Sequence, residues 1–89
     1  MLSKPKLTQR QMRAINALRS RPIMREELDR LAGCSNSPEL VCQLRRMGLD
    51  IDCQKISVLD RDGKVCKSGR YEFAPEAIVT LRAWGVEAA

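Results

Sequence analysis

The sequence contains no histidine, so it lacks the side chain that most often transfers protons near neutral pH. It also has no Gly-rich phosphate-binding loop and no nucleophile-elbow pattern. Without histidine, its four cysteines have no obvious general base to activate them. These absences leave no candidate catalytic residue, and the sequence predicts a protein that is not an enzyme.

Closely spaced cysteine pairs are missing as well. Structural zinc sites usually contain C-x2-C pairs, whereas the cysteines here are separated along the chain, at Cys34, Cys42, Cys53 and Cys66. We therefore expect no metal site and no cofactor, with reduced thiols that pack as small apolar side chains. A zinc site formed by distant cysteines, or one disulfide, are the less favoured alternatives.

Long apolar segments are absent too. No run approaches the roughly 18 residues that a membrane-spanning helix needs. The stretch "LSKPKLTQRQ" after Met1 is too polar for the apolar core of a secretory signal. The sequence thus predicts no membrane association and favours a cytoplasmic location.

Aromatic residues are limited to Tyr71, Phe73 and Trp84, although 44% of the chain is hydrophobic. A core of Leu, Ile, Val and Met is therefore expected, in one domain of 89 residues. Trp84 is expected to belong to that core rather than to an exposed dimer patch with Leu81 and Val79. Scarce aromatics also argue against RNA binding, because unstacked bases commonly stack on exposed aromatic rings.

Acidic residues are absent before Glu26, and the charge is unevenly distributed. Residues 1–49 carry ten Lys or Arg and four Asp or Glu, a net of +6, whereas residues 50–89 carry six and seven, a net of −1. A one-sided basic surface attracts polyanions, among which nucleic acid is the commonest. A solvated helix face with no ligand is the alternative.

Helix signals are clear in the first half of the chain. Thr8 and Gln11 form a capping box, and Leu7 and Met12 a hydrophobic staple, for a helix that ends near Ser20 because Pro22 follows. Residues 21–24 are a short extended link, which is a candidate third strand. A second helix is expected at 25–32, with Leu28 and Leu31 facing inward and Gly33 as its C′ residue.

A third helix is predicted at 37–47. Ser37 is expected as the N-cap and Pro38 as the first helical residue, where a missing N–H costs nothing. Its apolar side consists of Leu40, Val41, Leu44 and Met47, and Gly48 ends it.

The second half predicts a hairpin and a last helix. Residues 50–59 and 64–74 have strand character, and a two-residue Asp62-Gly63 loop would join them. That loop places one set of side chains on a common face, namely Ile56, Val58, Val65, Tyr71 and Phe73, and another on the opposite face, namely Lys55, Ser57, Ser68 and Arg70. Pro75 opens a helix with Ile78, Leu81 and Trp84 along one side.

This order of elements resembles a winged helix-turn-helix domain. The stretch "REELDRLAGCSNSPELVCQLRRMGLDI" is similar to small winged helix domains of phage and prophage proteins, and "GRYEF" resembles their returning wing strand. The resemblance covers roughly residues 8–74, after a basic tail at 1–7 and before a C-terminal helix at 75–85. Two departures are Met24, where a Ser or Thr cap is usual, and the acidic tip Asp60-Arg61-Asp62.

The resemblance implies an α+β fold in which a three-helix core carries a wing, and in which the helix at 37–47 enters the major groove of double-stranded DNA. With its apolar side inward, the residues expected to face outward are Asn36, Ser37, Glu39, Gln43 and Arg46. Gln pairs with adenine and Arg with guanine, whereas Glu accepts from cytosine but repels phosphate. Ordinary solvated side chains are the alternative for all five.

Other basic residues are candidates for phosphate contacts, which position a protein without specifying sequence. Arg45 has two readings, a phosphate contact or an ion pair with Glu26 or Glu27. The N-terminal candidates are Lys4, Lys6, Arg10 and Arg13, and those of the hairpin are Lys55, Lys64, Lys67 and Arg70. Residues 50–74 hold five basic and five acidic side chains. A wing that neutral favours a structural or protein-contacting role.

The resemblance implies a DNA-binding transcriptional regulator or accessory protein of the phage type, in the cytoplasm of a bacterial cell or a phage-infected host. A homodimer is plausible for so small a module, and a protein partner is kept as a further alternative. The rival hypothesis is a protein-interaction adaptor that uses the same scaffold without DNA.

Overall fold

Seven elements follow one another in residues 5–86, which are the residues that the computed structural model describes. In chain order they are α1 (Gln9–Ser20), β1 (Ile23–Met24), α2 (Arg25–Ala32), α3 (Ser37–Arg46), β2 (Ile51–Leu59), β3 (Val65–Phe73) and α4 (Pro75–Ala83). The expected α+β class is confirmed, and the 21–24 link does supply the third strand. Lys4 and most of the predicted 1–7 tail lie outside the described residues.

The start of α1 follows from local sequence. The Thr8 hydroxyl accepts a hydrogen bond from the Gln11 backbone N–H (3.1 Å), and the Gln11 side-chain oxygen accepts one from the Thr8 N–H (2.9 Å). The capping box is thereby confirmed. Leu7 and Met12, the two staple residues, are both partly buried against the core.

The α2 helix has the predicted bounds but a narrower buried face than expected. Gly33 ends it in the left-handed conformation with φ 73°, as its sequence position indicated. Leu28 and Ala32 are buried, one turn apart on the same face. Leu31 is 44% exposed, so its predicted inward position is wrong. In this helix of eight residues, only Leu28 and Ala32 are buried in the core.

The sheet has the strand order β1-β3-β2 and is antiparallel throughout. The predicted two-residue loop is wrong, because Leu59 pairs with Val65 and the chain turns over residues 60–64. The Asp60 carboxylate accepts the N–H groups of Asp62 and Lys64, both at 2.9 Å, and Gly63 adopts φ 75°. A turn closed by the Asp60 side chain therefore replaces the expected one.

The longer loop shifts the register by one residue, which exchanges the two faces of β2 relative to β3. Ile56 and Val58 consequently lie on the face opposite Tyr71 and Phe73, contrary to the prediction. Lys55 and Ser57 share the face of Tyr71 instead.

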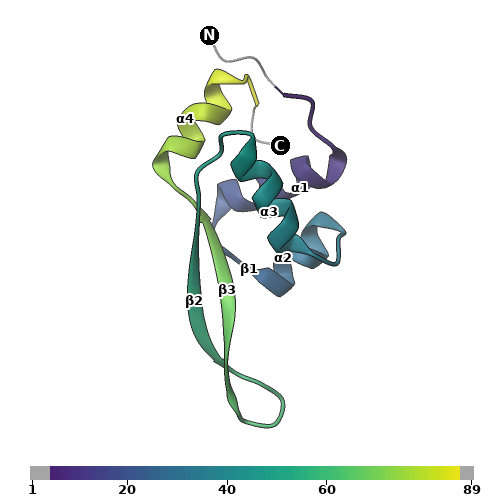
Figure 1. Cartoon of the computed structure of the whole chain (residues 1–89), viewed down its shortest axis with the longest axis vertical. Coiled ribbons are helices and arrows are strands. Elements are labelled where there is room, and N and C mark those ends of the chain that lie inside the picture. Colours follow the sequence, from purple (N-terminus) through teal and green to yellow (C-terminus); the bar gives the residue numbers. More distant parts are fainter. Residues whose placement is uncertain (1–4, 87–89) are drawn as a thin grey trace.

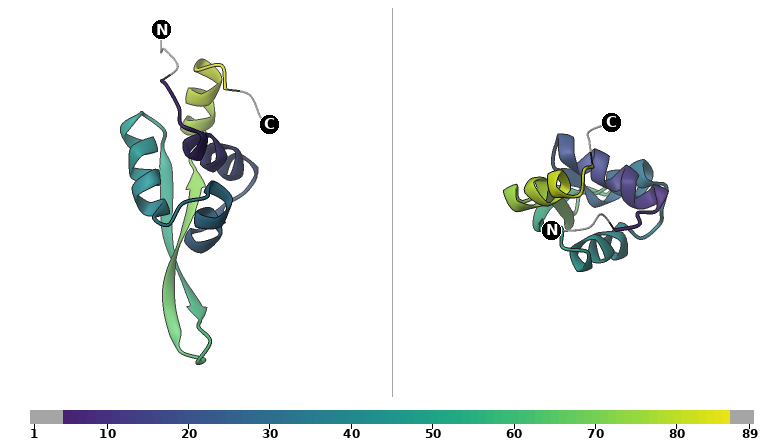
Figure 2. Two further views of the ribbon diagram at one scale, coloured as in Figure 1. Left: turned by 90° about the vertical axis from the view of Figure 1, so that its right-hand side faces the viewer. Right: turned by 90° about the horizontal axis from the view of Figure 1, so that it is seen from above.

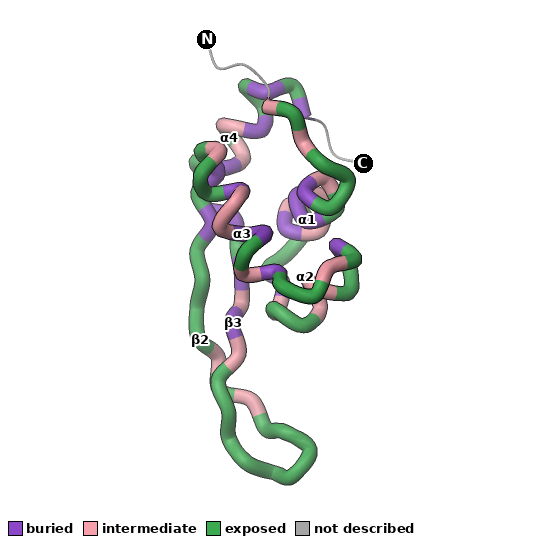
Figure 3. Tube along the Cα trace, turned by 45° about the vertical axis from the view of Figure 1, so that its right-hand side comes forward, coloured by how far each residue is buried: buried purple, intermediate pink, exposed green. Residues whose placement is uncertain are grey.

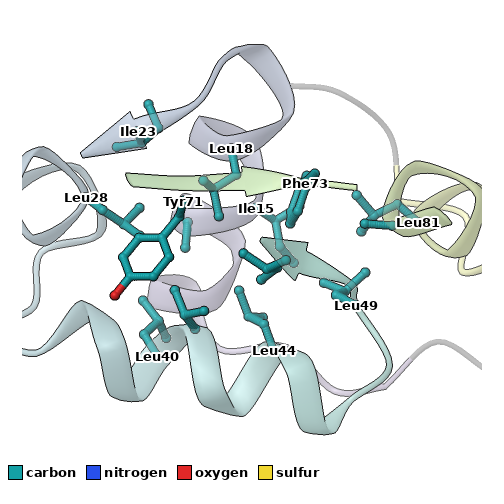
Figure 4. Packing of buried hydrophobic residues seen from close by; sticks show 14 of the residues in the cluster. Ile15, Leu18, Ile23, Leu28, Leu40, Leu44, Leu49, Tyr71, Phe73 and Leu81 are labelled. Atoms are coloured by element: carbon teal, nitrogen blue, oxygen red, sulfur yellow. The ribbon is translucent and has the colours of Figure 1, made fainter. Parts of the chain in front are cut away.

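The core lies where α1, α2, α3 and α4 meet the base of the sheet (Figure 4). Its fully buried members include Ile15, Leu28, Leu44, Leu49 and Leu81. Trp84 is 6% exposed, so it belongs to the core as expected. Val79 is the exposed large hydrophobic residue of α4, whereas Leu81 is buried with Trp84. The dimer patch that would require all three side chains to be exposed therefore does not form.

The distal part of the hairpin extends away from the helices, and it gives the molecule extents of 50 × 23 × 22 Å (Figures 1 and 2). α1, α2 and α3 lie on one side of the base of the hairpin, while α4 lies at the end opposite its tip (Figure 1). None of the helices within residues 5–86 has both the length and the apolar character to cross a bilayer.

Candidate nucleic-acid interface

The start of α3 is fixed by α2 rather than by its own N-cap. Asn36 is the N-cap and makes no capping hydrogen bond through its side chain. The Asp29 carboxylate accepts the Ser37 backbone N–H at 2.7 Å, which places a negative charge at the positive end of α3. The Ser37 hydroxyl donates to the Arg25 carbonyl at 3.1 Å. Two hydrogen bonds therefore connect α2 to the first residue of α3.

These contacts change the role of Ser37. Its side chain is 0% exposed, so it cannot face outward as predicted, and it is the first helical residue rather than the N-cap. The Asp29 carboxylate caps α3 from another helix, and nothing in the local sequence around Ser37 shows this. Asn36 is exposed beside it and stays a candidate for ligand contact.

The outward face of α3 carries three of the predicted contact residues. Glu39 and Arg46 are exposed, and Gln43 is half-buried between them. Glu39 Oε1 lies 3.8 Å from Arg46 Nη1, with the two side chains 51% and 73% exposed. An exposed ion pair of this kind is worth about 0–1 kcal/mol, so it leaves the Arg46 guanidinium free to exchange partners.

Gln43 also connects α3 to α1. Its side-chain oxygen accepts a hydrogen bond from Gln11 Nε2 at 3.1 Å, and Gln11 is buried by its own capping role. The Gln43 oxygen is thus turned toward α1, while its amide N–H groups remain able to donate. The bidentate contact to adenine expected of Gln needs both groups, so it would require this bond to break.

A groove of about 610 Å³ separates the start of α1 from the outward side of α3. The predicted residues along it are Arg10, Arg13, Asn36, Glu39 and Gln43. Arg10 is exposed at the groove, as a phosphate contact requires. The basic start of α1 and the face of α3 are therefore adjacent, which the sequence alone did not establish.

Arg13 is held by the end of α2. Its Nη1 donates to the Ala32 carbonyl at 3.3 Å and its Nη2 to Gln9 Oε1 at 3.5 Å. A cation at the carboxyl end of a helix is favoured by the helix dipole. A Cβ at Gly33 would lie 3.2 Å from the same guanidinium. Arg13 therefore stabilises the α2–α3 turn, and its value as a phosphate contact is reduced.

Within the described residues Arg45 forms no ion pair with Glu26 or Glu27, and its phosphate contact stays a prediction. Its Nε and Nη2 both donate to the Ile51 carbonyl, at 3.0 and 2.6 Å, and so tie α3 to the first residue of β2. Glu27 instead pairs with Arg21, and that hydrogen bond lowers the pKa of the Glu27 carboxyl. Arg45 is a structural residue here.

The hairpin divides its basic residues between two faces. Lys55 and Lys67 are exposed on the face toward the helices, where they line a second groove of about 440 Å³. Arg70 lies on the opposite face and donates to Gln54 Oε1. The prediction that Lys55 and Arg70 share a face is therefore wrong, and Arg70 is separated from the other two.

The second groove also contains a basic residue that the sequence analysis missed. Arg25, the first residue of α2, lines it with Lys55 and Lys67, while Glu26 and Asp29 supply two carboxylates. The observed hairpin register places Lys55 and Lys67 on the same face as the start of α2. The register predicted from sequence put Lys55 on the other face, so this group of cations was not found. Burial raises the pKa of Tyr71, which lies in the same groove, so its hydroxyl stays neutral near physiological pH.

The four cysteines are free within the described chain, with Cys34 and Cys42 half-buried and Cys53 and Cys66 exposed. Residues 5–86 contain no group of three or more side chains of Cys, Asp or Glu arranged to hold a metal ion.

A scan of protein-family models and searches of curated proteins and of solved structures all found no match to this chain.

Proposed function

We propose that this chain is a winged helix-turn-helix domain that binds double-stranded DNA, with α3 as the recognition helix and the β2–β3 hairpin as the wing. In biological terms we propose a cytoplasmic regulator or accessory protein of the phage or prophage type. One observation carries the proposal. The outward face of α3 lies between two grooves, and exposed cations line both, Arg10 on one side and Arg25, Lys55 and Lys67 on the other.

This arrangement suits a duplex because phosphates run along both rims of the major groove. A helix that enters the groove needs cations on each side of it, and only a few polar groups on its own outward face. Arg46, Gln43 and Asn36 are those groups in α3. Ser37, Arg13 and Arg45 support the scaffold instead, so the proposed interface is smaller than the sequence implied.

The test is a fluorescence anisotropy titration with random-sequence duplex at several salt concentrations. We expect binding that weakens as salt rises, because phosphate contacts release counterions. The double variant Lys55→Ala/Lys67→Ala should reduce the salt slope by about two units. Arg82→Ala, which removes one cation from α4 outside both grooves, should leave the slope nearly unchanged. Absence of binding at about 50 mM salt would contradict the proposal.

The second candidate is a protein-interaction adaptor. Its support is the distal hairpin, where Leu59 and Val65 are 71% and 70% exposed and the charges of residues 50–74 cancel. A correctly folded chain that does not bind DNA in the titration would favour this candidate.

A further inference from the structure

The outer edge of β2 is open along most of its length. β3 pairs with one side of β2, and no strand within residues 5–86 pairs with the other. Two backbone hydrogen bonds at the ends of the hairpin, Ala74 N–H to Asp50 and Asp60 N–H to Lys64, show that even-numbered residues of β2 bond to β3. The odd-numbered residues therefore direct their N–H and C=O groups outward.

One end of this edge is already occupied. Arg45 donates to the Ile51 carbonyl, so α3 covers the first outward-facing residue. The segment that remains available extends from Cys53 to Leu59, and its backbone donors and acceptors face solvent. Natural edge strands are usually protected by Pro, a bulge or several charges, yet this segment contains only Lys55.

The side chains of the distal hairpin are also poorly covered. Leu59 and Val65 pair with each other and are exposed on one face, while Ile56 and Val58 are half-buried on the other. In Figure 3 the distal hairpin is drawn as exposed over most of its length. A two-stranded hairpin on its own is marginal in water, and additional strands are what stabilise it.

We propose that two copies of this chain associate by antiparallel pairing of their β2 edges, forming a four-stranded sheet from two hairpins. The midpoint of the open segment is Ile56, so a two-fold axis at Ile56 uses the whole of it. In that register Cys53 lies opposite Leu59 of the second copy, and Lys55 lies opposite Ser57. About eight backbone hydrogen bonds result, two for each bonded pair.

The alternative registers are less favourable. A two-fold axis at Lys55 places two lysines directly opposite each other, which is destabilising. An axis at Gln54 needs the Ile51 carbonyl, which Arg45 occupies. An axis at Ile56 brings together the apolar side chains Ile56 and Val58 of both copies on one face, and supplies Leu59 with an apolar neighbour on the other. The zero net charge of residues 50–74 removes long-range repulsion between the hairpins.

The first experiment measures molar mass by light scattering and sedimentation over a range of protein concentrations, without DNA. We expect a dimer that dissociates on dilution. Ser57→Pro removes one outward N–H from β2 but none that bonds to β3, so it should raise the dimer Kd at least about tenfold. Lys67→Pro is the matched control, because Lys67 is the cross-strand neighbour of Ser57 and points its N–H toward the other edge of the hairpin.

The pattern of results decides the proposal. A dimer in the Lys67→Pro variant and a monomer in the Ser57→Pro variant support it. A wild-type chain that stays monomeric at about millimolar concentration, or a Ser57→Pro variant that dimerises normally, overturns it. Circular dichroism of both variants verifies that the helices are intact.

A crosslink tests the register even if both proline variants unfold the hairpin. Non-bonded antiparallel neighbours have Cα atoms about 4.5 Å apart, within the range for a disulfide. In a Cys53→Ser/Cys66→Ser background, Ile56→Cys should give a covalent dimer on mild oxidation, whereas Val58→Cys should not, because Val58 lies opposite Gln54. The absence of a crosslink in the Ile56→Cys chain overturns the proposal. Because no DNA is present, a failure here leaves the proposed DNA binding to its own test.

Discussion

Several polar side chains in this protein connect its elements by hydrogen bonds to backbone carbonyls. Ser37, Arg13 and Arg45 were expected at a DNA surface, yet each donates a hydrogen bond to a backbone carbonyl of another element. Polar residues near a helix-helix turn can serve either purpose, and sequence spacing does not distinguish the two. Burial excludes Ser37 from an outward face, whereas the two arginines make structural hydrogen bonds and remain exposed.

The Ser37 hydroxyl provides a prediction about stability. Ser37→Ala deletes a buried hydroxyl and its hydrogen bond to the Arg25 carbonyl, so unfolding free energy should fall by about 0.5–1.5 kcal/mol. Ser35→Ala, at an exposed position two residues earlier, should change it by less than about 0.5 kcal/mol. Urea denaturation measures both. Equal effects would mean that Ser37 does not anchor α3 to α2.

If α3 contacts bases, replacing Arg46 and replacing Arg10 should change DNA binding in different ways. A preferred sequence is first selected from a random duplex library. Arg46→Ala should then cost about 1–3 kcal/mol on that sequence and much less on random DNA. Arg10→Ala should weaken binding to both about equally and reduce the salt slope by about one unit. If no sequence is enriched and Arg46→Ala has no effect at low salt, α3 is not a recognition helix.

At the scale of elements, local signals predicted the helices well and the sheet less well. The capping box at Thr8 and the stop at Gly33 depend on neighbours three or four residues away, so the sequence displays them directly. The hairpin register depends on the Asp60 carboxylate, which closes a longer turn and exchanges the faces of β2. Asp-Gly is compatible with either turn, which is why the grouping of Arg25 with Lys55 and Lys67 could not be predicted.

The seam between α3 and the core offers a test of the helix faces. Leu44 is 0% exposed at the centre of that seam, so Leu44→Ala should lower unfolding free energy by about 2–5 kcal/mol. Leu31→Ala deletes the same atoms from a side chain that is 44% exposed, and should cost less than about 1 kcal/mol. Thermal melts of the two variants provide the comparison. A smaller loss for Leu44 than for Leu31 would refute the assigned faces.

At the scale of the whole molecule, the uneven charge of the sequence corresponds to a division in space. Residues 1–49, which have a net positive charge, include α1, α2 and α3. The hairpin, whose charges balance, extends away from these helices (Figure 1). Binding to a polyanion and self-association would therefore use separate parts of the surface. Lys55 and Lys67 are where the two parts meet, since their side chains lie on a sheet face and leave the β2 edge clear.

The projecting hairpin also governs how the protein diffuses. Its Cα radius of gyration of 13.8 Å exceeds the value of about 12 Å typical of a compact chain of this length. An elongated particle has more friction than a sphere of equal mass, so the monomer should elute early from a gel-filtration column calibrated with globular standards. It should also tumble at different rates about its long and short axes, giving amide relaxation rates that vary with bond direction. An apparent mass from elution volume alone would overstate the size of a single copy.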